Sequence, residues 1–157
     1  KMIEIDFDCE RKYHKSTIKL FIENSIDRIV DMLDLRQDFY LSVLITSNKK
    51  IKEINFNFRN INKPTNVLSF PQNEIRMIKN SENHLILGDI VLSIEKILYE
   101  SIELERNFWE HLLHIVTHGV LHLFGYDHQN EKDAKRMELK ENFILKKLKE
   151  NNICRKL

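Results

Sequence analysis

A run of histidines towards the C-terminal end constrains this chain more than any other feature. Five of the seven histidines lie between His111 and His128, in the segment HLLHIVTHGVLHLFGYDH. On a helix, His118 and His122 are one turn apart, so both rings can reach one zinc ion at the usual Zn–N distance of about 2.0–2.1 Å. Gly125 lets the chain turn back, and His128 then supplies a third nitrogen. Three protein ligands leave one coordination position open, which is typical of catalytic zinc.

The complete pattern, His-x-x-x-His-x-x-Gly-x-x-His, matches the ligand spacing of the metzincin proteases. Those enzymes have Glu directly after the first His, where it acts as the general base. Here that position is Gly119, which cannot accept a proton. The pattern therefore indicates a metal site and disfavours peptide hydrolysis. A phosphodiester, which needs charge neutralisation more than proton abstraction, is the better substrate. The nearby His111 and His114 are assigned to packing or to hydrogen bonds with the ligands.

Composition sets the broad class of the chain. At 157 residues with 42% hydrophobic residues, we expect one domain over residues 1–157. The net charge of +1 gives no global sign of nucleic-acid binding, although residues 49–79 are locally basic. Cys9 and Cys154 are expected to be two free thiols, with a disulfide as the alternative. No apolar run approaches the ~20 residues of a membrane span, and the first residues do not resemble a signal peptide, so a cytoplasmic protein is expected.

Hydrophobic periodicity predicts an α+β fold with about four strands in a mixed sheet and helices packed on it. The expected strands are residues 2–7, 39–46, 67–70 and 85–92. The expected helices are residues 16–33, 47–58, 93–98, 107–124 and 131–149, with a polar loop over 72–84. Ser16 or Thr17 is expected to cap the first helix, Ser47 and Ser93 to begin theirs, and Gly125 to end the zincin-like metal helix.

Three stretches of the sequence resemble one known family. The segment from His118 to His128 closely resembles the signature of the YbeY family of ribosomal RNA maturation factors. The stretch INFNFR, which ends at Arg59, and the following PTNVLSFP look like that family's central motif, and LGDIVLS resembles its next strand. The three stretches occur in the family's order, so the resemblance covers essentially the whole chain.

The resemblance implies a single-strand-specific endoribonuclease that acts in 16S rRNA 3′-end maturation and ribosome quality control. It implies one zinc ion at His118, His122 and His128, and a functional arginine at Arg59. The implied partners are single-stranded RNA, 16S rRNA and the ribosome or its proteins, with no membrane and no nucleotide cofactor. The family usually has Asp where this chain has Asn66, so the role of that position stays open.

Metal-assisted phosphodiester cleavage is the mechanistic hypothesis. Zinc polarises a phosphoryl oxygen or activates the attacking water. Arg59 grips the phosphate with its planar fork of donors and stabilises the charge of the transition state. Asp127 either orients a ligand or caps the loop. Whether water or the 2′-hydroxyl attacks stays open.

Two other functions remain possible from sequence. One is a ribosome-associated RNA-binding factor with a mainly structural zinc, which the C-terminal cations Lys140, Lys146, Lys147, Lys149, Arg155 and Lys156 would support. Interleaved Glu138, Glu141 and Glu150 favour instead a solvated helix face. A structural zinc has four protein ligands, so the three-histidine pattern favours the enzyme. The other is a zinc hydrolase of small molecules or peptides, which Gly119 disfavours in its peptidase form.

Overall fold

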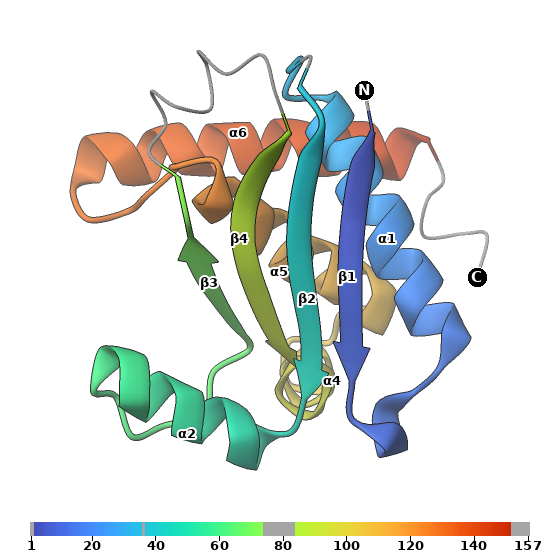
Figure 1. Cartoon of the computed structure of the whole chain (residues 1–157), viewed down its shortest axis with the longest axis vertical. Coiled ribbons are helices and arrows are strands. Elements are labelled where there is room, and N and C mark those ends of the chain that lie inside the picture. Colours follow the sequence, from blue (N-terminus) through green and yellow to red (C-terminus); the bar gives the residue numbers. More distant parts are fainter. Residues whose placement is uncertain (1, 36, 74–83, 152–157) are drawn as a thin grey trace.

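A four-stranded mixed sheet organises the computed structural model, which describes residues 2–35, 37–73 and 84–151. Its strands are β1 (Ile3–Cys9), β2 (Phe39–Thr46), β3 (Val67–Pro71) and β4 (Leu85–Ser93), in the order β1-β2-β4-β3 (Figure 1). β1, β2 and β4 run parallel, and β3 runs antiparallel along the edge of β4. The predicted α+β class and its mixed sheet are confirmed.

The α-helices of this described part are α1 (Ser16–Asp31), α2 (Asn48–Arg59), α4 (Ile94–Glu103), α5 (Phe108–Leu123) and α6 (Glu131–Glu150), with a short 3-10 turn at Arg11–Tyr13. The hydroxyls of Ser47 and Ser93 accept hydrogen bonds from the backbone of the first turns of α2 and α4, as predicted. The prediction for α1 is wrong: Ser16 is already helical, and the capping position belongs to Lys15, which makes no side-chain cap.

The main core lies between one face of the sheet and the helices α1, α5 and α6. Alternate residues of β2 point into it, namely Phe39, Leu41, Val43 and Ile45, all at most 1% exposed. α5 is the central helix of this layer and lies behind the sheet in Figure 1. Across the sheet, α2 buries Ile51 against Leu68 and Val91 in a smaller cluster. α5 is thus held firmly against the strands.

The closest approach of α5 to the sheet is at Gly119, which faces β3. A Cβ atom there would lie 3.1 Å from Val67 Cγ2 and 3.3 Å from Ser69 Oγ. The Ser69 hydroxyl donates to the Gly119 carbonyl at 3.0 Å. Glycine at this position allows the close packing, because even a methyl group would require Val67 and Ser69 to shift by a few tenths of an ångström.

α5 ends where the sequence predicted. Gly125 follows the last turn with φ 85°, the left-handed conformation that glycine adopts without strain. The chain then reverses before α6 begins at Glu131. This reversal carries His128 back towards the face of α5 that bears His118 and His122.

Several sequence predictions fall partly outside the described residues. Of the predicted polar loop, residues 74–83 lie outside, whereas Gln72 and His84 are exposed. Cys9 is a free thiol, and Cys154 lies outside, as do the basic residues 76, 79, 155 and 156. No helix among the described residues combines the length and the apolarity that a bilayer crossing requires.

The α5–β3 contact predicts that Gly119→Glu destabilises the fold. Its side chain would enter the space held by Val67 and Ser69, and its carboxylate would have to be buried. The free energy of unfolding should fall by at least about 3 kcal/mol, measured by urea denaturation. Gly119→Ala, which adds only a methyl group that requires small shifts, should cost less. A native urea midpoint for Gly119→Glu would contradict this account.

Candidate metal centre

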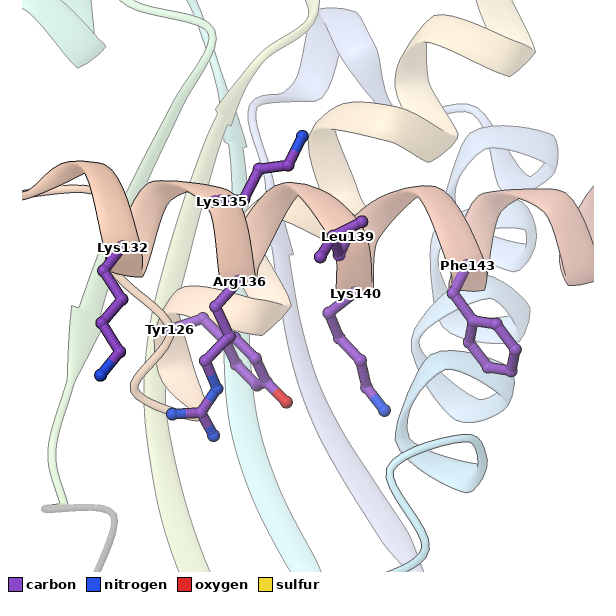
Figure 2. A pocket seen from close by; sticks show the side chains of 7 residues that line it. All are labelled: Tyr126, Lys132, Lys135, Arg136, Leu139, Lys140 and Phe143. Atoms are coloured by element: carbon purple, nitrogen blue, oxygen red, sulfur yellow. The ribbon is translucent and has the colours of Figure 1, made fainter.

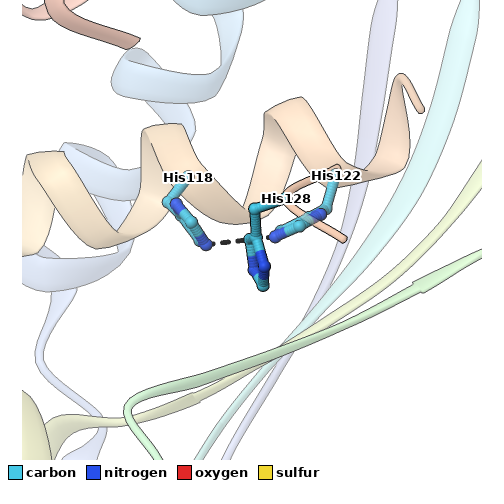
Figure 3. A group of neighbouring side chains, drawn as sticks. All are labelled: His118, His122 and His128. Atoms are coloured by element: carbon cyan, nitrogen blue, oxygen red, sulfur yellow. Dashed lines mark hydrogen bonds between the residues drawn. The ribbon is translucent and has the colours of Figure 1, made fainter. Parts of the chain in front are cut away.

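Three imidazole rings converge at the C-terminal end of α5. His118 and His122 come from its last two turns, and His128 approaches from the loop that follows (Figure 3). One nitrogen from each ring lies within 4.8 Å of the other two. The Nε2 atoms of His118 and His122 are 3.0 Å apart. Two nitrogens on a tetrahedral zinc ion stand about 3.4 Å apart, so small ring movements suffice and the triad fits a metal ion.

The environment of His122 favours its neutral form. Burial, together with the neighbouring His118 and His128, lowers the pKa of His122 to about 4. A backbone hydrogen bond at Tyr126 and the Asp127 charge act in the opposite direction and are outweighed. A metal binds the neutral imidazole, so protons compete little for His122 near neutral pH.

Glu141 of α6 supports the metal-facing side of α5. Its Oε2 lies 2.9 Å from His118 Nδ1, and its Oε1 lies 2.5 Å from His114 Nε2. A neutral His118 that donates from Nδ1 to this carboxylate keeps the lone pair of Nε2 free. That nitrogen is the one facing His122. Such a carboxylate–histidine contact orients the ring and makes it a better metal ligand.

Glu141 is ionised in spite of its burial. Its residue is only 9% exposed, and this burial by itself raises the carboxyl pKa. Hydrogen bonds with His114 and His118 outweigh the burial and lower the pKa of Glu141 to about 2. The site therefore contains a fixed negative charge next to the imidazoles, which favours a bound cation.

The interpretation of Glu141 as part of a solvated helix face is wrong. Glu141 lies on the same face of α6 as Met137, Ile144 and Leu148, and these residues form the buried side of the helix. Their spacing of three and four residues is visible in the sequence, so an acidic residue within that apolar stripe was a usable signal. What the sequence did not show was the partner, because α5 and α6 meet only in the folded chain.

Arg59 lies in the same cleft as the histidines. It is the last residue of α2, and the following residue, Asn60, caps the helix in the left-handed conformation with φ 57°. One terminal nitrogen of the guanidinium, Nη2, donates to the Ser69 carbonyl of β3 at 3.2 Å. The cleft has a volume of about 870 Å³, and its walls include Arg59 and the triad. The fold thus brings together the arginine and the histidines that the sequence singled out.

Asn66 and His111 meet at Glu100 of α4. The Asn66 amide donates to Glu100 Oε2 at 3.0 Å, and His111 Nε2 lies 2.9 Å from the same oxygen. His111 is 4% exposed, which agrees with its assignment to packing. An amide is the better partner for Glu100, because Asp at position 66 would place two carboxylates together. Asn66 also lines the cleft, so this network shapes the cleft wall.

Asp127 stabilises the loop between α5 and α6. Its Oδ1 accepts a hydrogen bond from the backbone N–H of His128 at 2.7 Å. This contact corresponds to the loop-capping alternative and fixes the backbone from which His128 projects. Asp127 and His114 both line the cleft beside the triad.

Comparison with known proteins identifies the family. The family model described as endoribonuclease YbeY matches residues 4–149. The chain belongs to the YbeY family. A YbeY endoribonuclease of Bartonella bacilliformis is 44% identical over 127 residues, covering 80% of this chain and 79% of that protein. The predicted family resemblance is therefore confirmed.

Other YbeY relatives extend the likeness along the chain. The YbeY endoribonuclease of Buchnera aphidicola is 38% identical over 92% of this chain and 88% of its own length. The solution structure of a Thermotoga maritima protein superimposes with a TM-score of 0.57 at 30% identity. It covers 92% of this chain and 87% of the Thermotoga chain. The chain is therefore similar in sequence to YbeY relatives, and in fold to the Thermotoga protein, over most of its length.

Replacement of the triad should remove the metal. His118→Ala, His122→Ala and His128→Ala should each bind much less zinc, because a site with three protein ligands has no ligand to spare. His111→Ala and His114→Ala should retain more. Elemental analysis of the purified variants measures this, and loss of metal should lower the melting temperature. Full zinc occupancy in all three of the first variants would exclude this ligand set.

Glu141→Gln should weaken the metal site without removing a ligand. The amide accepts fewer hydrogen bonds than the carboxylate and carries no charge, so His118 is held less firmly. We expect about 10- to 100-fold weaker zinc affinity, measured by competition with a chromophoric chelator. Glu138→Gln is the matched control, since Glu138 is on the same helix and pairs with Lys135 at the surface. Equal affinities for the two variants would show that Glu141 does not support the site.

Proposed function

We propose that this chain is a zinc-dependent, single-strand-specific endoribonuclease. The observation that carries the proposal is the shared cleft of Arg59 and the three histidines, in a chain of the endoribonuclease YbeY family. A phosphodiester offers negatively charged oxygens to both parts of such a cleft. The proposal thus assigns His118, His122 and His128 to the metal and Arg59 to the phosphate.

Zinc is the metal that the donor set supports best. Imidazole nitrogen is a usual zinc ligand, and three histidines with an open position are typical of catalytic zinc sites. Zinc bound there supplies a Lewis acid close to the substrate phosphate. Glu141 holds His118 in the orientation that faces this ion, and the low pKa of His122 keeps that ring neutral.

Arg59 is suited to bind the substrate phosphate and stabilise charge in the transition state. Its contact with the Ser69 carbonyl uses only part of its donor fork, and within the described part of the chain no other partner occupies the remaining N–H groups, which can reach phosphate oxygens. A guanidinium positioned before the reaction loses little free energy in reorganising as charge develops. The residue therefore acts on the substrate, while the histidines act on the metal.

The family resemblance supports a cellular role for this activity. We propose that the substrate is 16S rRNA near its 3′ end, and that the chain acts with the ribosome in rRNA maturation and quality control. The same proposal includes a cytoplasmic location and one YbeY-like domain over residues 1–157. The match of the family model over residues 4–149 supports this domain extent.

Two alternatives are less favoured. A ribosome-associated factor with a structural zinc would need a fourth protein ligand, whereas the group that converges among the described residues consists of three histidines. A peptidase would need a general base after His118, where this chain has Gly119, which offers no proton acceptor and packs closely against β3. The endoribonuclease accounts for both features and for Arg59.

Arg59→Ala should separate phosphate binding from metal binding. The variant should keep near-native zinc content and folding, because its guanidinium is no metal ligand. Cleavage of a single-stranded RNA should fall about 10²–10³-fold, as expected when a charge-stabilising donor is removed. Arg59→Lys should recover only part of the rate, because an ammonium lacks the bidentate fork. Rates are measured with metal-replete protein at fixed salt.

Lys52→Ala provides the matched control for Arg59→Ala. Lys52 is an exposed cation on the same helix, and it does not line the cleft. Its removal should leave cleavage close to the native rate. An unchanged rate in Arg59→Ala would exclude its catalytic role, and zinc loss in that variant would assign Arg59 to the fold instead.

A further inference from the structure

A second concave surface lies along α6, next to the metal cleft. It has a volume of about 730 Å³. Its lining joins cations to large apolar side chains, namely Tyr126, Lys132, Lys135, Arg136, Leu139, Lys140 and Phe143 (Figure 2). We call this surface the α6 groove. No acidic side chain is among its lining residues, so it is a cationic surface with aromatic rings.

The groove is a continuous stripe on one side of the helix. Lys132, Arg136 and Lys140 follow one another at four-residue spacing, and Phe143 comes three residues later, so the four side chains share a face. Figure 2 shows them pointing to the same side of α6, with Tyr126 among them. The stripe is about 16 Å long at 1.5 Å per residue. It therefore offers charge at regular intervals along an extended path.

Apolar surface is exposed between these charges. Leu139 is 59% and Phe143 51% exposed. Lys140 Nζ lies 5.8 Å from the centre of the Phe143 ring. The guanidinium carbon of Arg136 lies 5.4 Å from the centre of the Tyr126 ring. Aromatic faces next to cations are the elements with which proteins hold unpaired bases and their phosphates. A duplex, whose bases are stacked inside, could not use the rings in this way.

Tyr126 joins the α6 groove to the metal cleft, because it lines both. A strand with its scissile phosphate beside Arg59 and the histidines would thus pass Tyr126 directly onto the groove. We propose that the α6 groove binds the single-stranded RNA that flanks the cleavage site, with phosphates on Arg136 and Lys140 and a base stacked on Phe143. This inference rests on the proposed endoribonuclease function and extends it to the substrate path.

Charge favours RNA over a protein as the occupant. Lys135 is neutralised in part by Glu138 at 3.4 Å, and it points away from the stripe in Figure 2. Each of the other three cations lacks an ion-pair partner within 4.0 Å in the described part of the chain. A strand of phosphates satisfies several such charges at once and releases its bound counterions.

The first experiment removes two cations of the groove. The double variant Arg136→Ala and Lys140→Ala is compared with Lys146→Ala and Lys149→Ala, which removes the same charge from α6 outside the groove. Binding of a fluorescent single-stranded RNA to the metal-loaded full chain is measured by anisotropy at several salt concentrations. The groove variant should reduce the slope of log affinity against log salt by about 1.4, since each phosphate contact on a single strand contributes about 0.7. The control should keep the native slope.

The second experiment tests stacking at Phe143. Phe143→Tyr keeps an aromatic face and should bind RNA as the native chain does. Phe143→Leu keeps apolar surface without a ring, and its affinity should fall about 5- to 150-fold, the range expected for loss of one base–aromatic contact. Phe143→Leu should raise KM and Phe143→Tyr should retain the native KM, while kcat stays near native in both. The strand is checked on a gel after each binding measurement, so that cleavage does not distort the affinity.

Each result bears on the groove separately from the catalytic proposal. Native affinity and salt slope in the groove variants, with intact RNA cleavage, would overturn the groove and leave the endoribonuclease. Weaker binding in the groove variants without cleavage by the native chain would support the groove and contradict the enzyme. Native binding by Phe143→Leu would identify a merely apolar docking face, and absence of RNA binding by the native chain would also overturn the proposal.

Discussion

The contact between α5 and β3 at Gly119 is the constraint on which the candidate site depends. Because position 119 has no side chain, the Ser69 hydroxyl can reach the Gly119 carbonyl at 3.0 Å. Ser69 also anchors Arg59 through its own carbonyl. One residue of β3 therefore fixes the arginine on one side and the metal helix on the other. The residue that removes the protease base from this helix is the same one that allows this close packing.

α6 contributes to the site from a different direction. Its inner side places an ionised, buried Glu141 against His118 and His114. Its flank carries the cations and rings of the α6 groove. Because one helix bears both features, the orientation of a metal ligand and the proposed path of the RNA share a rigid support.

Much of the fold was predictable because the sequence patterns are local. The alternation in β1 and the three-and-four spacing of α1 gave element positions to within a few residues, and Gly125 gave the end of the metal helix. The capping residue of α1 was mispredicted, since a hydroxyl near a helix start does not establish that it caps. The pairing of Glu141 with His118, and of Asn66 with Glu100, was out of reach because these contacts join separate elements. The sequence indicates which residues share a helix face, but it does not indicate which residue of another element each of them contacts.

The compactness of the ligand set in the sequence has a consequence for folding. His118, His122 and His128 all come from a single short segment, so a denatured chain keeps them close together. Such a chain would keep some of the zinc affinity that we propose, and the ion would stabilise the native state only by the excess of its native affinity. Glu141 belongs to another helix and reaches His118 only after α5 and α6 have docked. The contribution of Glu141 to the proposed metal affinity is therefore coupled to the docking of α5 and α6.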